Sequence, residues 1–152
     1  MQSTEYTVQP LGAAKGGKPA FYNLLLWEKA QTLASQLVLL VDGLPQTRSA
    51  NALGNQLLRA GTSIAANIAE GYGRYSDPAF RNHLSIARGS LFETESWIDL
   101  LARASYLPHD RAAGLIDACE EIARLITSAM KPLKRARATI REERGEYVTS
   151  AT

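Results

Sequence analysis

The stretch QLLRAGTSIAANIAEG, residues 56–71, decides the fold of this chain. Its apolar residues recur at helical spacing, and its polar residues follow one another three or four positions apart. At about 3.6 residues per turn, this spacing places the polar side chains in one narrow stripe beside the apolar stripe. The remaining face is small or apolar and carries no charge, so the sequence predicts a helix with no solvated side. The polar stripe consists of Gln56, Arg59, Ser63, Asn67 and Glu70.

Polar groups on such a helix need hydrogen-bond partners, because an unpaired buried polar group costs about 1–3 kcal/mol. The segment SLFETESW, residues 90–97, offers them. A carboxylate such as Glu93, facing Arg59 or accepting a hydrogen bond from the Asn67 amide, would satisfy both sides. We therefore expect a structural polar network that joins two helices, and we favour it over a catalytic pocket. Its expected members are Gln56, Arg59, Ser63, Asn67, Glu70, Ser90, Glu93 and Glu95.

Turn and cap signals divide the chain into four amphipathic helices. A Gly-Leu-Pro turn closes the first helix, and a Gly-Tyr-Gly turn that begins at Gly71 closes the second. Asp77 is the expected N-cap of the third helix, because Pro78 follows it at the first helical position. The four predicted helices cover residues 21–42, 51–70, 77–104 and 108–141.

The pattern of these segments predicts the fold class. No segment alternates apolar and polar residues with the period of two that a half-buried strand shows. Short connections between amphipathic helices favour antiparallel neighbours, so we predict an all-α fold, an antiparallel up-down-up-down four-helix bundle. A chain of 152 residues suits one domain. We expect the bundle at residues 21–141, between flexible tails at 1–20 and 142–152.

Residues that carry catalysis in other proteins are scarce and scattered here. His83 and His109 fall on different segments, and neither has a His, Cys or carboxylate at metal-ligand spacing. Ser63 and Ser90 lack a neighbouring histidine base that would activate them. Cys119, the only cysteine, is expected to be a small core residue. The sequence therefore predicts no enzymatic activity, no metal and no cofactor.

The sequence also indicates where the protein resides. No apolar stretch approaches the roughly 20 residues that cross a bilayer. The first 20 residues lack the basic and apolar regions of a secretion signal. A single cysteine excludes an internal disulfide and fits a reducing compartment. We expect a cytoplasmic protein without membrane contact.

Positive charge is concentrated near the end of the chain. The net charge is only +2, yet KPLKRARATIREER, residues 131–144, holds six Lys or Arg against two Glu, a local balance of +4. If the last helix continues past Pro132, part of this segment forms a basic stripe that could track phosphates. The alternative is that these cations offset the helix macrodipole and solvate the surface. The candidate nucleic-acid-binding residues, which include two arginines of the third helix, are Arg81, Arg88, Lys131, Lys134, Arg135, Arg137, Arg141 and Arg144.

A second place for nucleic acid is the turn after residue 71, which holds Tyr72, Arg74 and Tyr75. Aromatic side chains interleaved with arginine can stack on exposed bases. Tyrosines at the end of a bundle more often cover the edge of the core, and we favour that interpretation.

Two stretches together resemble a known family. Residues 56–71 with their glycine turn, and FRNHLSIARGSLFETESWIDLLARASYLP at residues 80–108, are similar to a bacterial four-helix-bundle family. The family is named for proteins encoded in intervening sequences of 23S ribosomal RNA genes and is also labelled the S23 ribosomal protein family. A distant branch is the accessory variability determinant of diversity-generating retroelements. The resemblance covers about residues 21–130, and its most specific positions are Gln56, Arg59, Ala60, Ser63, Ile64, Asn67, Ile68, Ala69, Glu70, Gly71, Ala87, Gly89, Ser90, Leu91, Glu93 and Glu95.

The resemblance implies an assembly and a role. It implies a homopentamer of four-helix bundles, binding of nucleic acid and, in the retroelement branch, a reverse transcriptase as partner. It attaches no enzymatic activity. Our first hypothesis is therefore a non-enzymatic oligomeric protein that binds RNA or DNA through a basic surface. The alternative is a protein–protein interaction adaptor, for example a reverse-transcriptase accessory subunit.

Overall fold

The computed structural model describes residues 24–74 and 76–143, and it describes side chains up to Lys131. Four helices account for most of this part of the chain, namely α1 (Leu25–Asp42), α2 (Arg48–Tyr72), α3 (Asp77–Arg103) and α4 (His109–Glu143). No strand occurs within residues 24–74 and 76–143. The predicted tail 1–20, and all but two residues of the predicted tail 142–152, lie outside the described residues.

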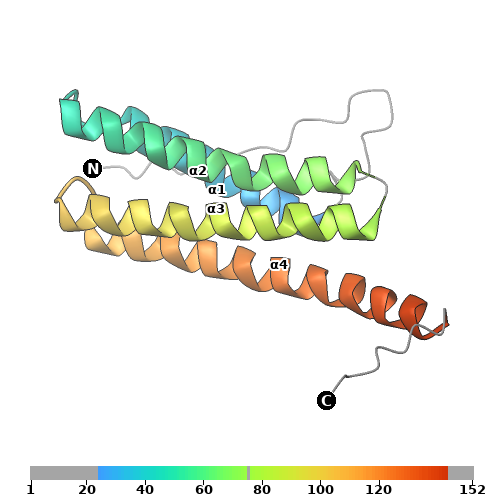
Figure 1. The fold of residues 1–152 in the computed structure, drawn as a ribbon. Coiled ribbons are helices and arrows are strands. Elements are labelled where there is room, and N and C mark those ends of the chain that lie inside the picture. The colour runs from blue at the N-terminus through green and yellow to red at the C-terminus, as the bar shows by residue number, and fades with distance from the viewer. Residues whose placement is uncertain (1–23, 75, 144–152) are drawn as a thin grey trace, which may run out of the picture.

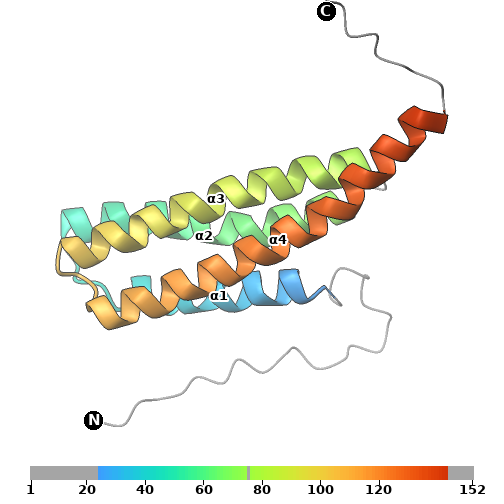
Figure 2. The same cartoon turned by 90° about the horizontal axis from the view of Figure 1, so that it is seen from below.

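The helices pack as an antiparallel bundle in which neighbours in the sequence are also neighbours in space. Figure 1 shows α1 and α2 above α3 and α4, with the chain direction reversing from each helix to the next. The most extensive contact is between α2 and α3, followed by the contacts of α1 with α2 and of α3 with α4, while α1 and α4 close the bundle. The predicted all-α four-helix fold is therefore confirmed. Its final helix is the longest, and the end of α4 extends beyond the other three helices in both views (Figures 1 and 2).

Side-chain caps explain where two of the helices begin. Thr47 caps α2, and its Oγ1 accepts a hydrogen bond from the backbone N–H of Ala50 (3.2 Å), so the helix begins three residues before the predicted start. The prediction that Asp77 caps α3 is wrong. Ser76 is the N-cap, and its Oγ accepts from the backbone N–H of Ala79 (3.3 Å). Asp77 lies instead in the first turn, where its charge complements the helix macrodipole.

The core follows the apolar seams of the four helices. Each helix contributes aliphatic side chains that solvent does not reach, because one stripe of each amphipathic helix faces the centre of the bundle. Burying such side chains contributes about 1.5–3 kcal/mol each before the entropy cost of folding. No helix within the described residues is long and apolar enough to cross a membrane. The largest fully buried aliphatic side chains are Leu33, Leu37, Leu57, Ile64, Ile68, Leu84, Leu91, Ile98, Leu101, Ile122 and Ile126.

The expectation that the second helix has no solvated side is wrong for the single chain. Its apolar stripe is buried, but Gln56, Arg59 and Glu70 are exposed. Small and uncharged side chains, including Thr62 and Ala66, lie exposed between them. We call this surface the α2 outer face and define it as the exposed residues Asn51, Ala52, Asn55, Gln56, Arg59, Thr62 and Ala66. Arg59 is its only charged member, and the exposed charges of Arg48 and Glu70 lie at its two ends.

Candidate nucleic-acid interface

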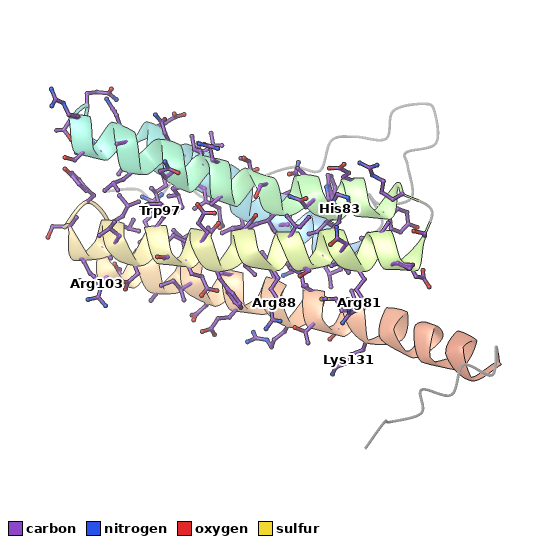
Figure 3. All side chains as sticks on the ribbon, viewed as in Figure 1. Arg81, His83, Arg88, Trp97, Arg103 and Lys131 are labelled. Atoms are coloured by element: carbon purple, nitrogen blue, oxygen red, sulfur yellow. The ribbon has the colours of Figure 1, made fainter. Side chains whose placement is uncertain are left out.

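Three of the predicted nucleic-acid-binding residues meet in one pocket between α3 and α4. Arg81 and Arg88 come from α3, and Lys131 comes from α4 (Figure 3). The pocket has a volume of about 190 Å³, and its lining residues are Arg81, Arg88, Thr127, Met130 and Lys131. We call it the α3–α4 basic pocket. It places three cations around one space without a carboxylate among the lining residues.

Helical spacing and antiparallel packing together build this pocket. Arg81 and Arg88 are seven residues apart, which is close to two turns, so both lie on one face of α3. The packing of α4 against that helix brings Thr127 and Lys131, also one turn apart, to the same place. Met130 supplies an apolar wall against which the stems of the long cationic side chains can lie.

The cations of the pocket retain unused hydrogen-bonding capacity. Nε of Arg81 is buried and has no hydrogen-bond partner among the described residues. A buried donor without a partner costs free energy, and Arg81 would recover that cost if its side chain turned to offer this donor to an anion. The Arg88 guanidinium lies over the ring of Phe92, with its central carbon 5.3 Å from the ring centroid. The pocket is therefore complementary to an anion that offers several acceptor oxygens, such as a phosphate group.

The remaining predicted basic residues lie further along the final helix. The helix continues through Pro132 to Glu143, so positions 134, 135, 137 and 141 are helical, as expected. They lie in the last part of α4, the end of which extends past the other three helices (Figure 2). The side chains of Lys134, Arg135, Arg137 and Arg141 lie outside the described residues, and so does Arg144. The helix thus carries a basic segment that begins directly at the pocket.

The structure places the partners of the polar stripe differently from the expectation. Ser63 and Asn67 are satisfied within α2, because Oγ of Ser63 donates to the carbonyl of Ala60 (2.9 Å) and Nδ2 of Asn67 donates to the carbonyl of Ser63 (2.8 Å). The cross-helix partner of Asn67 is His83, whose Nδ1 lies 3.3 Å from its Oδ1. Glu93 instead accepts a hydrogen bond from Nε1 of Trp97 on its own helix (3.3 Å).

His83 is the residue of this region that sequence reasoning missed. Its Nε2 also lies 3.9 Å from Oε1 of Glu70, which pairs with Arg74. The hydrogen bond from Arg74 lowers the pKa of Glu70, and the charges of His83 and Arg74 add to this effect. Part of the signal was present in the sequence, because Asn67 lies five residues before the end of α2 and His83 lies six residues after the start of α3. Residues at similar distances from the connection of two antiparallel helices lie at the same level, and the helical phase decides whether they face one another.

The other expected network members sit in ordinary surroundings. Gln56 and Arg59 are exposed on the α2 outer face. The carbonyl of Ser90 accepts from Oγ1 of Thr94 (2.8 Å). Glu95 is partly buried, and its pKa is raised by that burial and by the charge of Glu120. The predicted polar network as a whole stays a prediction.

Cys119 is not an activated nucleophile. Burial raises the pKa of the Cys119 thiol to about 12, and the charges of Glu95 and Glu120 add to the effect. The thiol is therefore protonated and unreactive at neutral pH. Within the part of the chain that the structure describes, no group of three His, Cys, Asp or Glu residues could hold a metal ion.

Tyr72 packs edge-on against Phe80, with ring centroids 5.8 Å apart, which favours its role as a cover for the end of the core.

Comparison with known proteins identifies the family. The family described as 23S rRNA-intervening sequence protein matches residues 22–128. This chain belongs to that family. The chain is also similar to a protein of unknown function from the S23 ribosomal protein family of Bacteroides thetaiotaomicron. The crystal structure of that protein superposes on this chain with a TM-score of 0.67 at 33% sequence identity. The similarity covers 70% of this chain and 99% of that one. No curated protein matches the chain significantly.

The family match divides the candidate interface in two. Arg81, Arg88 and Thr127 lie inside the matched residues, whereas Met130, Lys131 and the basic segment after them lie beyond residue 128. The α3–α4 basic pocket therefore forms where the 23S rRNA-intervening sequence protein fold meets an extension of α4 that is outside the family match.

Proposed function

We propose that this protein is a non-enzymatic, oligomeric helical bundle of the cytoplasm that binds RNA or DNA through the α3–α4 basic pocket and the basic segment of α4. The observation that carries the proposal is the convergence of Arg81, Arg88 and Lys131 on one pocket without a lining carboxylate. Phosphate groups of a nucleic-acid backbone are the anions that such a set of donors fits best, since guanidinium groups bind them in a bidentate way.

The basic segment of α4 supports the same function. It continues from Lys131 along a helix that projects past the bundle, so it offers successive cations along one direction (Figure 2). A polyanion contacts many such cations at once and releases its counterions. Binding through this segment and the pocket together would be strongly dependent on salt and only weakly dependent on sequence.

The α2 outer face supports assembly into an oligomer. A surface with one charge among seven exposed residues is suited to a protein interface, because charged residues are depleted from interface cores. The family resemblance points to five subunits. A ring of identical subunits would repeat the basic pocket, and repeated weak phosphate contacts gain affinity through avidity.

A binding titration tests the proposed function. We expect a structured RNA to bind at low salt and to dissociate as salt rises, because each phosphate contact adds about 0.7–0.9 to the slope of log K against log salt. The triple variant Arg81→Ala, Arg88→Ala, Lys131→Ala should lower the affinity at least tenfold and reduce this slope by about 2. Filter binding at a series of salt concentrations measures both.

A matched variant controls for net charge. Arg48, Arg103 and Arg111 are exposed cations at the opposite end of the bundle, since they lie at the start of α2, the end of α3 and the start of α4. Replacing these three by alanine removes the same charge and should leave most of the affinity. If both triple variants lose affinity equally, the pocket has no special role. If the wild-type protein does not bind nucleic acid at low salt, the proposed function is wrong.

The alternative function is a protein–protein adaptor, for example an accessory subunit of a reverse transcriptase. Leu25, Val38 and Leu39 leave apolar side chains exposed on α1, which suits contact with a protein. This alternative predicts that α1 variants, and not pocket variants, abolish the function. Co-purification with the reverse transcriptase, where one is encoded beside this protein, distinguishes the two.

A further inference from the structure

An exposed aromatic side chain lies beside the basic pocket. Phe92 is on α3, one turn after Arg88, and 47% of its surface is exposed. A phenylalanine with half of its ring in water gives up part of the stabilisation that burial provides. The position therefore suits a ring that is covered by a ligand.

Arg88 joins this ring to the pocket. Arg88 lines the pocket, and the central carbon of its guanidinium lies 5.3 Å from the centroid of the Phe92 ring. The Phe92 ring therefore lies next to Arg88, which is also one of the cations that line the pocket. Cation–π contacts at exposed sites are weak, so Arg88 can exchange the ring for a phosphate oxygen and leave the ring face open.

The combination of cations and an open ring face favours one form of nucleic acid. A base inside a duplex is stacked on its neighbours and cannot lie on a protein ring. A base in a single strand, loop or bulge can, and stacking on an aromatic side chain tolerates any base because each has a π-face.

Resting on the proposed nucleic-acid binding, we propose that the site selects unpaired nucleotides, with one phosphate in the α3–α4 basic pocket and a neighbouring base stacked on Phe92. The pocket supplies the affinity for phosphate, which a duplex shares. Phe92 supplies the preference for single strands, which the cations alone do not provide.

Alanine substitution of Phe92 tests the preference. With a single-stranded oligouridine as the probe, Phe92→Ala should weaken binding by about tenfold or more, the fold-change that corresponds to the loss of one stacked base. With a fully paired RNA duplex of equal length, the same variant should change the affinity less than twofold. Fluorescence anisotropy with labelled probes measures both affinities.

Ile86 provides the matched control. It lies on the same helix, 46% of its surface is exposed, and it is not among the residues that line the pocket. Ile86→Ala should leave the affinity for oligouridine unchanged. Both variants remove an exposed side chain, so both are expected to fold, and circular dichroism verifies this.

Two further arms separate stacking from general apolar contact. An abasic oligonucleotide keeps the phosphates and lacks bases, so wild type and Phe92→Ala should bind it equally. Phe92→Trp should bind oligouridine about as tightly as wild type does, in contrast to Phe92→Ala. Its indole fluorescence, corrected for the signal of a protein that already holds Trp27 and Trp97, should be quenched on binding.

The outcomes distinguish this inference from the proposed function. If wild type binds oligouridine and the triple pocket variant does not, while Phe92→Ala binds as wild type does, the stacking inference is overturned and the proposed function stands. A Phe92→Ala effect that is equal for duplex, abasic and single-stranded probes also overturns it. If light scattering shows that Phe92→Ala has a different number of subunits from wild type, the ring belongs to a protein interface instead. Absence of all binding by wild type overturns both.

Discussion

Glu95 is a carboxyl group whose ionisation opposes folding. It lies partly buried on α3, and its pKa is raised by that burial and by the charge of Glu120. A carboxyl whose pKa is higher in the folded state binds its proton more tightly there, so stability is greatest below the unfolded value of 4.5 and falls as pH rises through the folded pKa. The free energy of unfolding should therefore decrease with pH in this window.

The substitution Glu95→Gln removes this effect at the residue level. It should raise the free energy of unfolding at pH 7 by at most about 1 kcal/mol, because solvent screens a partly exposed carboxylate, and it should give no gain below pH 4.5. Urea unfolding at pH 4 and pH 7 measures the difference. Asp117→Asn replaces an exposed carboxylate of α4 and is the control. A gain of equal size at both pH values would contradict the assignment.

At the scale of elements, α2 and α3 approach each other closely where α2 ends. The glycine turn predicts a helix end at residue 70, but α2 continues to Tyr72 and its C-cap is Gly73. Gly71 lies inside the helix and is buried against α3, where a Cβ would collide with Cβ of His83 and come within 3.2 Å of Phe80. The glycine is thus required for close approach of two helices and not for the turn.

The substitution Gly71→Ala tests this contact. Because Cβ of His83 cannot move without its backbone, the added methyl group must push α2 and α3 apart, and we expect a loss of about 1–3 kcal/mol in the free energy of unfolding. Gly89→Ala on α3 is the control, since nothing lies within 4 Å of the added Cβ. It should stabilise the protein by up to about 1 kcal/mol through helix propensity. Thermal unfolding of both variants measures the contrast.

The elements themselves were largely predictable, and their contacts were less so. Apolar spacing fixes the existence and number of helices, because it depends on local sequence alone. Thr47 starts α2 ahead of the predicted residue, whereas Ser76 takes the cap role expected of Asp77 and leaves the start of α3 where it was predicted. Arg81 and Arg88 could be placed on one face from their spacing, but their meeting with Lys131 depends on the register of α3 against α4, which local sequence does not encode.

At the scale of the whole molecule, the exposure of the α2 outer face depends on assembly. This face carries a single charge, that of Arg59, and the single chain leaves it exposed, so the sequence pattern and the structure agree if other subunits cover it. The proposed assembly would also account for the sequence pattern, in which the polar stripe looks buried although the single chain leaves much of it exposed.

A charge on this face should therefore break the proposed pentamer. Ala66 is an exposed member of the α2 outer face, so Ala66→Glu would bury one carboxylate per subunit at a repeated interface and destabilise the assembly by several kcal/mol. Light scattering should give five chains of 16.6 kDa for wild type and fewer for the variant. Ala113→Glu, an exposed alanine on α4, should leave the assembly intact.

A monomeric wild type at micromolar concentration would remove the pentamer and the avidity it gives to phosphate binding, whereas the pocket of each chain could still bind RNA. Comparing the salt dependence of RNA binding in wild type and Ala66→Glu therefore measures how much of the affinity belongs to the assembly, because loss of avidity should lower the affinity without changing which pocket residues are required.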